Sequence, residues 1–115
     1  MARRRRRAEG APEPGRLAAA GPGRFELSGE VGFDDAARLL AEGDAAFGSQ
    51  PAIEIDLARV ARADSAGLAL LLEWSLVAAS AGRVLRYRNV PPAIASLAGI
   101  SDVAELLAPG GGAAS

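Results

Sequence analysis

The longest apolar segment of the chain, residues 66–81, constrains the fold most strongly, because it must be hidden either in a membrane or in a protein interior. A membrane-spanning helix needs about 20 apolar residues, whereas this segment has sixteen and carries Glu73 at its middle. An ionised side chain at bilayer depth costs at least about 2.5 kcal/mol on insertion scales. The segment therefore predicts a buried helix of a soluble domain, and Gly82 is suited to end it because glycine readily adopts positive φ.

Strand patterns and helix patterns alternate on both sides of this helix, which predicts an α/β domain with a partly parallel sheet. Gly21-Pro22-Gly23 is a strong signal for the turn of a β-hairpin. The elements expected are the hairpin strands 16–20 and 24–28, a helix over 34–47 that Asp34 could cap, a strand over 52–57, the helix over 66–81, a strand over 84–88, a helix from Pro92 to about Ala98, and a short helical turn or last strand over 99–107. One domain, residues 16–108, would lie between a disordered basic arm, residues 1–15, and a disordered tail, residues 109–115.

The composition limits the chemistry that this domain could perform. The chain has neither cysteine nor histidine, which excludes disulfides, thiolate metal sites and a Ser-His-Asp arrangement. Carboxylates alone would have to act as acids or bases, and no Walker-type phosphate loop is present. We therefore expect a binding protein without a metal or cofactor, and not an enzyme.

The run Arg3 to Arg7 separates a basic arm from an acidic body. Its five arginines account for the difference between a formal net charge of −1 for the whole chain and −6 for the rest, which argues against a nucleic-acid partner. The residues after the run include Glu9 and Pro12 rather than an apolar stretch, so a signal peptide is rejected and a cytoplasmic location is expected. The arm could tether the protein to anionic lipid or acidic protein, or be an unselected extension.

The Asp64-Ser65 turn lies where a strand is expected to end and a helix to begin. The first amides of that helix lack intrahelical partners, so they could receive an anion or a phosphoryl group. Ser65 is well placed as the N-cap with its hydroxyl at the surface, while Asp64 could orient that hydroxyl or bond to its own backbone. A purely structural cap and a functional hydroxyl both fit this pattern. Gly67 is a poor helix former, which indicates a close approach by another backbone.

The helix over 66–81 is apolar on two nearly opposite faces. These are Leu68, Leu71, Leu72, Ser75 and Ala79 on one side, and Leu70, Trp74, Val77 and Ala81 on the other. One face must pack on the sheet. A neighbouring helix could cover the second, but we expect a protein partner to do so, because a Trp-centred apolar stripe is typical of interface anchors.

Three segments of the chain, taken together, resemble the STAS family of anti-sigma factor antagonists and transporter domains. They are Glu26-Leu27-Ser28-Gly29-Glu30, Ile55-Asp56-Leu57 and Asp64-Ser65-Ala66-Gly67-Leu68. The resemblance spans about Leu17 to Leu107 and implies a mixed β-sheet of four to five strands flanked by three to four helices. Residues 67–74 and 89–92 are most similar to the MlaB-type members, cytoplasmic subunits of the bacterial phospholipid transporter that maintains outer-membrane lipid asymmetry.

This resemblance implies a non-catalytic subunit that binds the ATPase subunit of an ABC transporter and, through it, the inner-membrane permease. The protein would be peripheral at the inner membrane without inserting into it. It also implies that Ser65 and the neighbouring Asp64 lie at the contact with the ATPase. Together with the second apolar face of the helix, this gives the expected partner-binding residues, which are Asp64, Ser65, Ala66, Gly67, Leu70, Trp74 and Val77. The second hypothesis is an anti-sigma factor antagonist in which a kinase phosphorylates Ser65 and the added charge of about −2 breaks the complex. An exposed apolar stripe favours the first hypothesis, because it suits a lasting partner.

Overall fold

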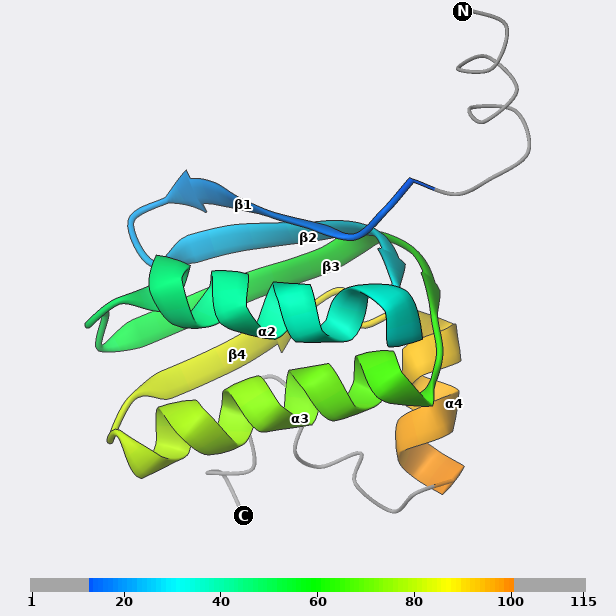
Figure 1. Cartoon of the computed structure of the whole chain (residues 1–115). Helices are drawn as coiled ribbons and strands as arrows, with labels where there is room; N and C mark the ends of the chain where they lie inside the picture. Colours follow the sequence, from blue (N-terminus) through cyan, green and yellow to red (C-terminus); the bar gives the residue numbers. More distant parts are fainter. Residues whose placement is uncertain (1–12, 101–115) are drawn as a thin grey trace, which may run out of the picture.

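A four-stranded sheet runs through the molecule and carries its helices (Figure 1). The computed structural model describes residues 13–100, and for residues 98–100 the backbone alone. The strands lie side by side in the order β1 (Arg16–Gly21), β2 (Arg24–Val31), β3 (Ala52–Ala63) and β4 (Val84–Arg88). β1 pairs with β2 in the antiparallel sense, whereas β2, β3 and β4 are parallel. The predicted hairpin is confirmed, and its turn requires the positive φ of Gly21 and Gly23.

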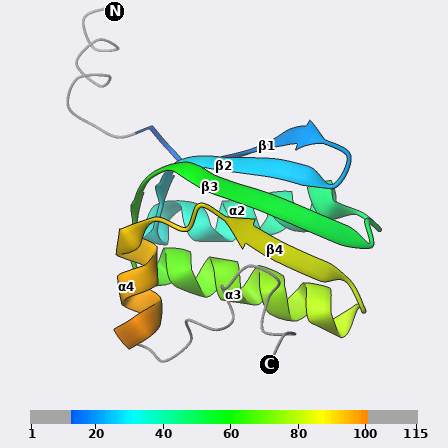
Figure 2. The same ribbon diagram turned by 180° about the vertical axis from the view of Figure 1, so that it is seen from behind.

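The three described helices follow the parallel strands. They are α2 (Phe33–Phe47), α3 (Ser65–Ser80) and α4 (Pro92–Ile100). α2 and α3 lie next to each other on one face of the sheet, and α4 stands at one end of α3 (Figures 1 and 2). The two crossovers run in the same direction along the sheet, from β2 to β3 and from β3 to β4, and therefore place their helices on the same face. The α/β fold with a mixed sheet and flanking helices is confirmed.

The core fills the space between the sheet and α2 and α3. Residues of β2, of β4 and of β3 as far as Leu57 alternate between buried and more exposed positions, as the pleat of a sheet with one covered face requires. On α2 the buried positions are Leu39, Gly43 and Phe47, whereas Ala37 and Ala41 are exposed. The buried apolar side chains are Phe25, Leu27, Val31, Leu39, Phe47, Ile53, Ile55, Leu57, Leu68, Leu70, Leu71, Trp74, Ala78, Leu85, Tyr87 and Ile94.

Only half of the second apolar face of α3 is covered by α2, because Leu70 and Trp74 are buried whereas Val77 and Ala81 are exposed. Leu70 is 3% exposed and Trp74 only 1%, so the expectation that they form an accessible anchor is wrong. The Trp74 ring packs edge to face against the Phe47 ring, with 5.3 Å between the ring centroids. Phe47 packs in the same way against Phe25, with 5.1 Å between the centroids. Sequence periodicity cannot show this, because a helix that packs on a sheet and on a neighbouring helix is apolar nearly all round.

The prediction that Gly82 ends the helix α3 is confirmed. Gly82 has a φ of 73°, and its amide donates to the carbonyl of Ala79 at 3.0 Å. The Arg83 amide donates to the carbonyl of Ala78 at 2.8 Å. These two bonds form a Schellman motif, which ends the helix after Ser80 and turns the chain into β4.

The packed domain begins before Arg16, the start expected from the sequence. The Glu30 amide donates to the carbonyl of Glu13 at 2.9 Å, Pro14 forms a bridge with Glu30, and Gly15 is buried. The predictions for residues 1–12, for a helical turn or strand beyond Ile100, and for the tail 109–115 lie outside the described residues. None of the helices within residues 13–100 is both long and apolar enough to cross a membrane.

Candidate functional site

Asp64, and not Ser65, caps α3. Its backbone is extended, with a φ of −123°, and its Oδ1 accepts hydrogen bonds from the amides of Ala66 at 2.9 Å and Gly67 at 3.1 Å. Ser65 is instead the first helical residue, and its side chain is exposed. A carboxylate is favoured over a hydroxyl at this position because the helix dipole attracts negative charge. The prediction of Ser65 as the N-cap is therefore wrong, and its hydroxyl does not cap the helix.

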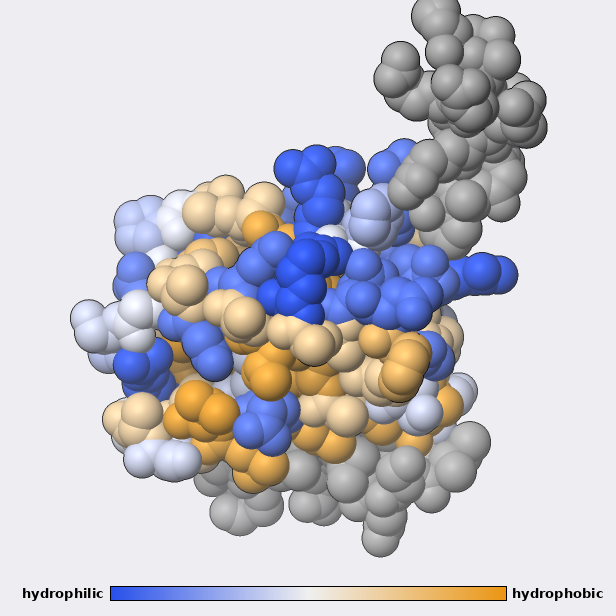
Figure 3. Space-filling model, in the orientation of Figure 1, coloured by the Kyte–Doolittle hydropathy of each residue, from blue (hydrophilic) through white to orange (hydrophobic). Residues whose placement is uncertain are grey.

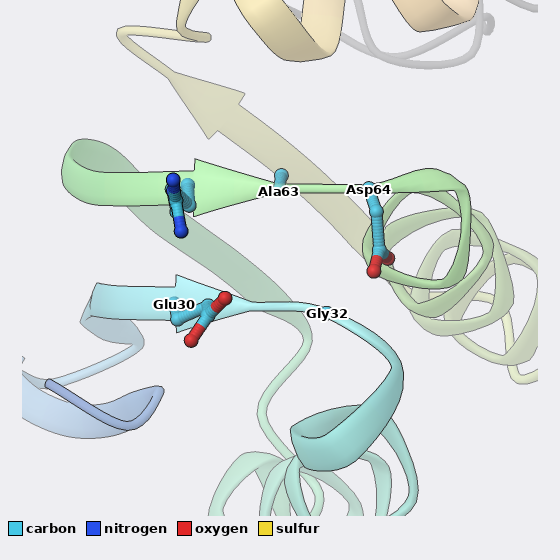
Figure 4. A pocket seen from close by; sticks show the side chains of 5 residues that line it. Glu30, Gly32, Ala63 and Asp64 are labelled. Atoms are coloured by element: carbon cyan, nitrogen blue, oxygen red, sulfur yellow. The ribbon is translucent and has the colours of Figure 1, made fainter. Parts of the chain in front are cut away.

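The same carboxylate also holds the start of α2. Oδ2 of Asp64 accepts a hydrogen bond from the amide of Phe33 at 3.2 Å, and the Asp64 side chain points away from the end of β3 toward the side of Gly32 (Figure 4). Gly32 is the N-cap of α2 and offers no side chain for capping. A Cβ atom at Gly32 would lie 2.9 Å from Oδ2 of Asp64. Asp34 lies inside the first helical turn and is not the cap that the sequence predicts.

Gly67 brings the first turn of α3 against the end of β2. A Cβ atom there would collide with the carbonyl oxygen of Val31 and lie 3.0 Å from its carbonyl carbon. The close backbone approach predicted at Gly67 is confirmed. Gly67 is itself buried, so its contribution to the site is to place Asp64 and Ser65 beside the end of β2.

A shallow hollow of about 250 Å³ opens between the ends of β2 and β3 (Figure 4). Its lining is Glu30, Gly32, Arg62, Ala63 and Asp64. Ligands of open α/β sheets bind beyond the carboxyl ends of parallel strands, which is where this hollow lies. Within residues 13–100 no group of three potential metal ligands comes together. The hollow therefore offers polar recognition by carboxylates and one guanidinium.

The surface beside the turn carries an aromatic residue that sequence analysis did not identify. Phe33, the first residue of α2, is 81% exposed. It precedes Leu40 by seven residues, about two helical turns, so periodicity alone would place it toward the core. The fully buried residues of α2 begin only at Leu39, beyond the first turn in which Phe33 lies. No local pattern in the sequence indicates this exposure, because it depends on how α2 packs in the fold.

The outer surface of α3 is apolar as well. Leu76 is 57% exposed and Val77 is 45% exposed. In Figure 3 hydrophobic residues gather over the lower half of the molecule, where α3 lies, and hydrophilic residues dominate the upper half. Of the seven residues expected to bind a partner, Asp64, Ser65 and Val77 are exposed and Ala66 is half-buried, whereas Gly67, Leu70 and Trp74 are buried.

Comparisons with known proteins agree with this architecture. The family described as "Mlab, STAS domain" matches residues 17–108. Among curated proteins, no sequence matches this chain.

Three solved structures share the fold. The anti-sigma factor antagonist SpoIIAA in its unphosphorylated form is 17% identical over 72% of this chain and 79% of that chain, with a TM-score of 0.58. The Bacillus cell fate determinant SpoIIAA in the phosphorylated form is 21% identical over 77% of this chain and 84% of that chain, with a TM-score of 0.57. The murine anion transporter Slc26a9 in the inward-facing state is 15% identical over 75% of this chain and 14% of that chain, with a TM-score of 0.52.

Proposed function

The chain belongs to the MlaB-type STAS domain family, and from this we propose that it is a non-catalytic subunit that binds the ATPase of a phospholipid ABC transporter. It supports the assembly or activity of the transporter and needs no cofactor of its own. The protein sits in the cytoplasm and reaches the inner membrane through the ATPase and the permease. The transporter maintains outer-membrane lipid asymmetry.

The exposed apolar surface of α3 is the observation that carries this proposal. The helix begins at Ser65, which is exposed, and it presents Leu76 and Val77 to solvent further along. Large apolar side chains on the surface of a small domain favour a lasting protein contact, because leaving them in water costs free energy. With neither histidine nor cysteine in the chain, the turn is better suited to recognition than to covalent catalysis.

An anti-sigma factor antagonist is the second candidate, supported by the exposure of Ser65 and by the likeness of fold to SpoIIAA. A phosphate on Ser65 would add a charge of about −2 next to the Asp64 carboxylate. That carboxylate already occupies the amides of Ala66 and Gly67, so the phosphate would be repelled and could break a complex. This candidate ranks second because reversible release does not require the apolar surface of α3.

Affinity purification of the tagged protein from its own cells, in mild detergent, tests the proposal. Mass spectrometry should identify an ABC ATPase and its permease among the partners, with Ser65 unmodified. Val77→Asp should abolish their recovery. Val84→Asp is the matched control, because Val84 is 48% exposed and alternates along β4 with Leu85 and Tyr87, which face the helices.

The two candidates differ in the outcome of this experiment. Recovery of a soluble kinase-like protein, together with phosphate on Ser65, would favour the anti-sigma factor antagonist. Equal recovery of the ATPase with Val77→Asp and with Val84→Asp would show that the outer surface of α3 is not the contact.

A further inference from the structure

We propose that Phe33 is the aromatic anchor of the partner interface, that Asp64 positions it, and that it enters an apolar pocket with a basic rim on the partner protein. This inference rests on the proposed function, because it adds the start of α2 to the docking surface on α3. It assigns a role to a residue that lies outside the Asp64-Ser65 turn in sequence but next to it in space.

The side chain of Phe33 is exposed, whereas its backbone is held in place by hydrogen bonds. It has the largest exposed fraction, 81%, among the large apolar residues exposed in the described part of the chain. Its backbone lies in the first turn of α2, where the Asp35 and Ala36 amides donate to the carbonyl of Gly32 at 3.0 and 2.9 Å. A rigid aromatic side chain loses little conformational entropy on binding, and aromatic residues are enriched in interface cores.

Asp64 ties this turn to α3. Because Gly32 has no side chain, α2 has no cap of its own, and the Phe33 amide is satisfied by Oδ2 of Asp64 at 3.2 Å. Gly32 fits closely against the Asp64 carboxylate, which would have to shift to admit a Cβ atom 2.9 Å from Oδ2. Asp64 therefore acts as a positioning residue, because it fixes the distance between Phe33 and the neighbouring Ser65.

The charges around Phe33 indicate the kind of partner. Asp34 and Asp64 are exposed and Glu30 is half-buried, whereas the hollow beside them contributes one cation, Arg62. This excess of carboxylates would be repelled by an anionic lipid surface. A symmetric contact with a second copy would bring the same carboxylates together. A different protein with basic side chains around an apolar pocket is the complementary surface.

Quantitative affinity purification with the wild-type chain and three variants tests whether Phe33 is the anchor. Phe33→Ala should lose the ABC ATPase that the wild type recovers, Phe33→Leu should retain part of it, and Val84→Ala should behave as wild type. With the purified ATPase as the probe, Phe33→Ala should raise the dissociation constant by about tenfold or more. Thermal unfolding should be nearly unchanged, because the side chain is exposed.

The outcomes separate the anchor from the proposed function. If Phe33→Ala and the wild type bind the ATPase equally, Phe33 is not the anchor, whereas the proposed function as an ATPase-binding subunit is retained. A different result would be that the wild type recovers no ABC ATPase but does recover another identified protein. If that protein, once purified, binds the wild type at least about tenfold more tightly than Phe33→Ala, the proposed function is wrong and the role of Phe33 as the anchor is supported. If no partner depends on Phe33, the anchor is overturned.

A double-mutant cycle tests the role of Asp64. Asp64→Ala should weaken binding of the ATPase in the wild-type background and have little further effect in the Phe33→Ala background, because both changes remove the same contact. Asp64→Asn, which keeps a capping oxygen, serves as the second variant if Asp64→Ala folds poorly. Equal losses of affinity in both backgrounds would show that Asp64 acts independently of Phe33.

Discussion

The edge of the Trp74 indole lies against the backbone of Gly43, so that a methyl group at position 43 would come within 2.5 Å of Cε2 of that ring. This contact sets the distance between α2 and α3. It also explains why the only tryptophan of the chain is 1% exposed, although its helix is apolar on two faces. The same tight packing leaves the indole Nε1 buried with no hydrogen-bond partner among the described residues.

Gly43→Ala should destabilise the domain by about 1–3 kcal/mol, because the added methyl overpacks the contact with Trp74. In an unobstructed helix interior the same change would stabilise by roughly 0.5–1 kcal/mol, since alanine is the better helix former. Urea unfolding measures the difference. In a Trp74→Phe background the smaller ring should reduce the loss, and an equal loss in both backgrounds would contradict the proposed clash.

Trp74→Ala should cost about 3–5 kcal/mol of unfolding free energy, because it leaves a cavity between α2 and α3. Urea unfolding followed by circular dichroism gives this value without using the tryptophan as the probe. Leu76→Ala, at a residue 57% exposed on the same helix, should cost far less. A small loss at Trp74 would restore the interpretation of this side chain as an interface anchor.

Asp64→Ala should destabilise by about 2 kcal/mol, because it removes the cap of α3 and the acceptor for the Phe33 amide. Ser65→Ala should change stability by less than about 0.5 kcal/mol, since Ser65 is not the cap. Thermal unfolding of both variants measures the comparison. A larger loss for Ser65→Ala than for Asp64→Ala would assign the cap to the serine.

Tyr87→Phe should destabilise by about 1 kcal/mol, because the Tyr87 hydroxyl donates to the carbonyl of Leu71 at 2.7 Å in the core between β4 and α3. Burial raises the pKa of Tyr87 well above its usual range. As the pH rises above about 10, tyrosine ionises in the unfolded chain but not in the folded one, so the wild type loses stability. Unfolding measured at neutral and alkaline pH should therefore show the two proteins converging.

Asn89→Gly should raise the pKa of Asp56 toward its ordinary value. The Asn89 side-chain amide donates to Oδ1 of Asp56 at 2.9 Å and, with the Ala58 amide, holds the pKa of this carboxyl below its usual range. Glycine keeps the backbone suited to the φ of 56° found at Asn89 while removing the donor. An NMR titration of the Asp56 carboxyl carbon measures the change.

The sign of the accompanying pH effect follows from the lowered pKa of Asp56. Its folded-state pKa lies below the unfolded value, so its contribution to stability is present above the unfolded pKa of about 3.9 and is lost as the pH falls through the folded pKa. Asn89→Gly should therefore lose less stability on acidification than the wild type. An unchanged Asp56 titration would show that the Asn89 hydrogen bond does not hold in solution.

The elements that the sequence predicted well depend on interactions between near neighbours in the chain. The Gly21-Pro22-Gly23 turn, the helix ending at Gly82 and the alternation along β4 each follow from local backbone preferences and burial periodicity. Together with the residues resembling the STAS family, these patterns were sufficient for the α/β architecture. β3 was predicted too short, because its second half, after Leu57, does not keep the regular alternation of buried residues.

The details of the candidate site were decided by tertiary structure. Phe33 and Asp64 are 31 residues apart, and only the parallel pairing of β2 and β3 brings the two helix starts together. Similarly, Gly43 and Trp74 belong to helices whose relative placement no local pattern contains. Whether an apolar side chain faces a partner or a neighbouring helix depends on which surfaces the fold brings together, so the burial of Trp74 and the exposure of Phe33 could be learned only from the structure.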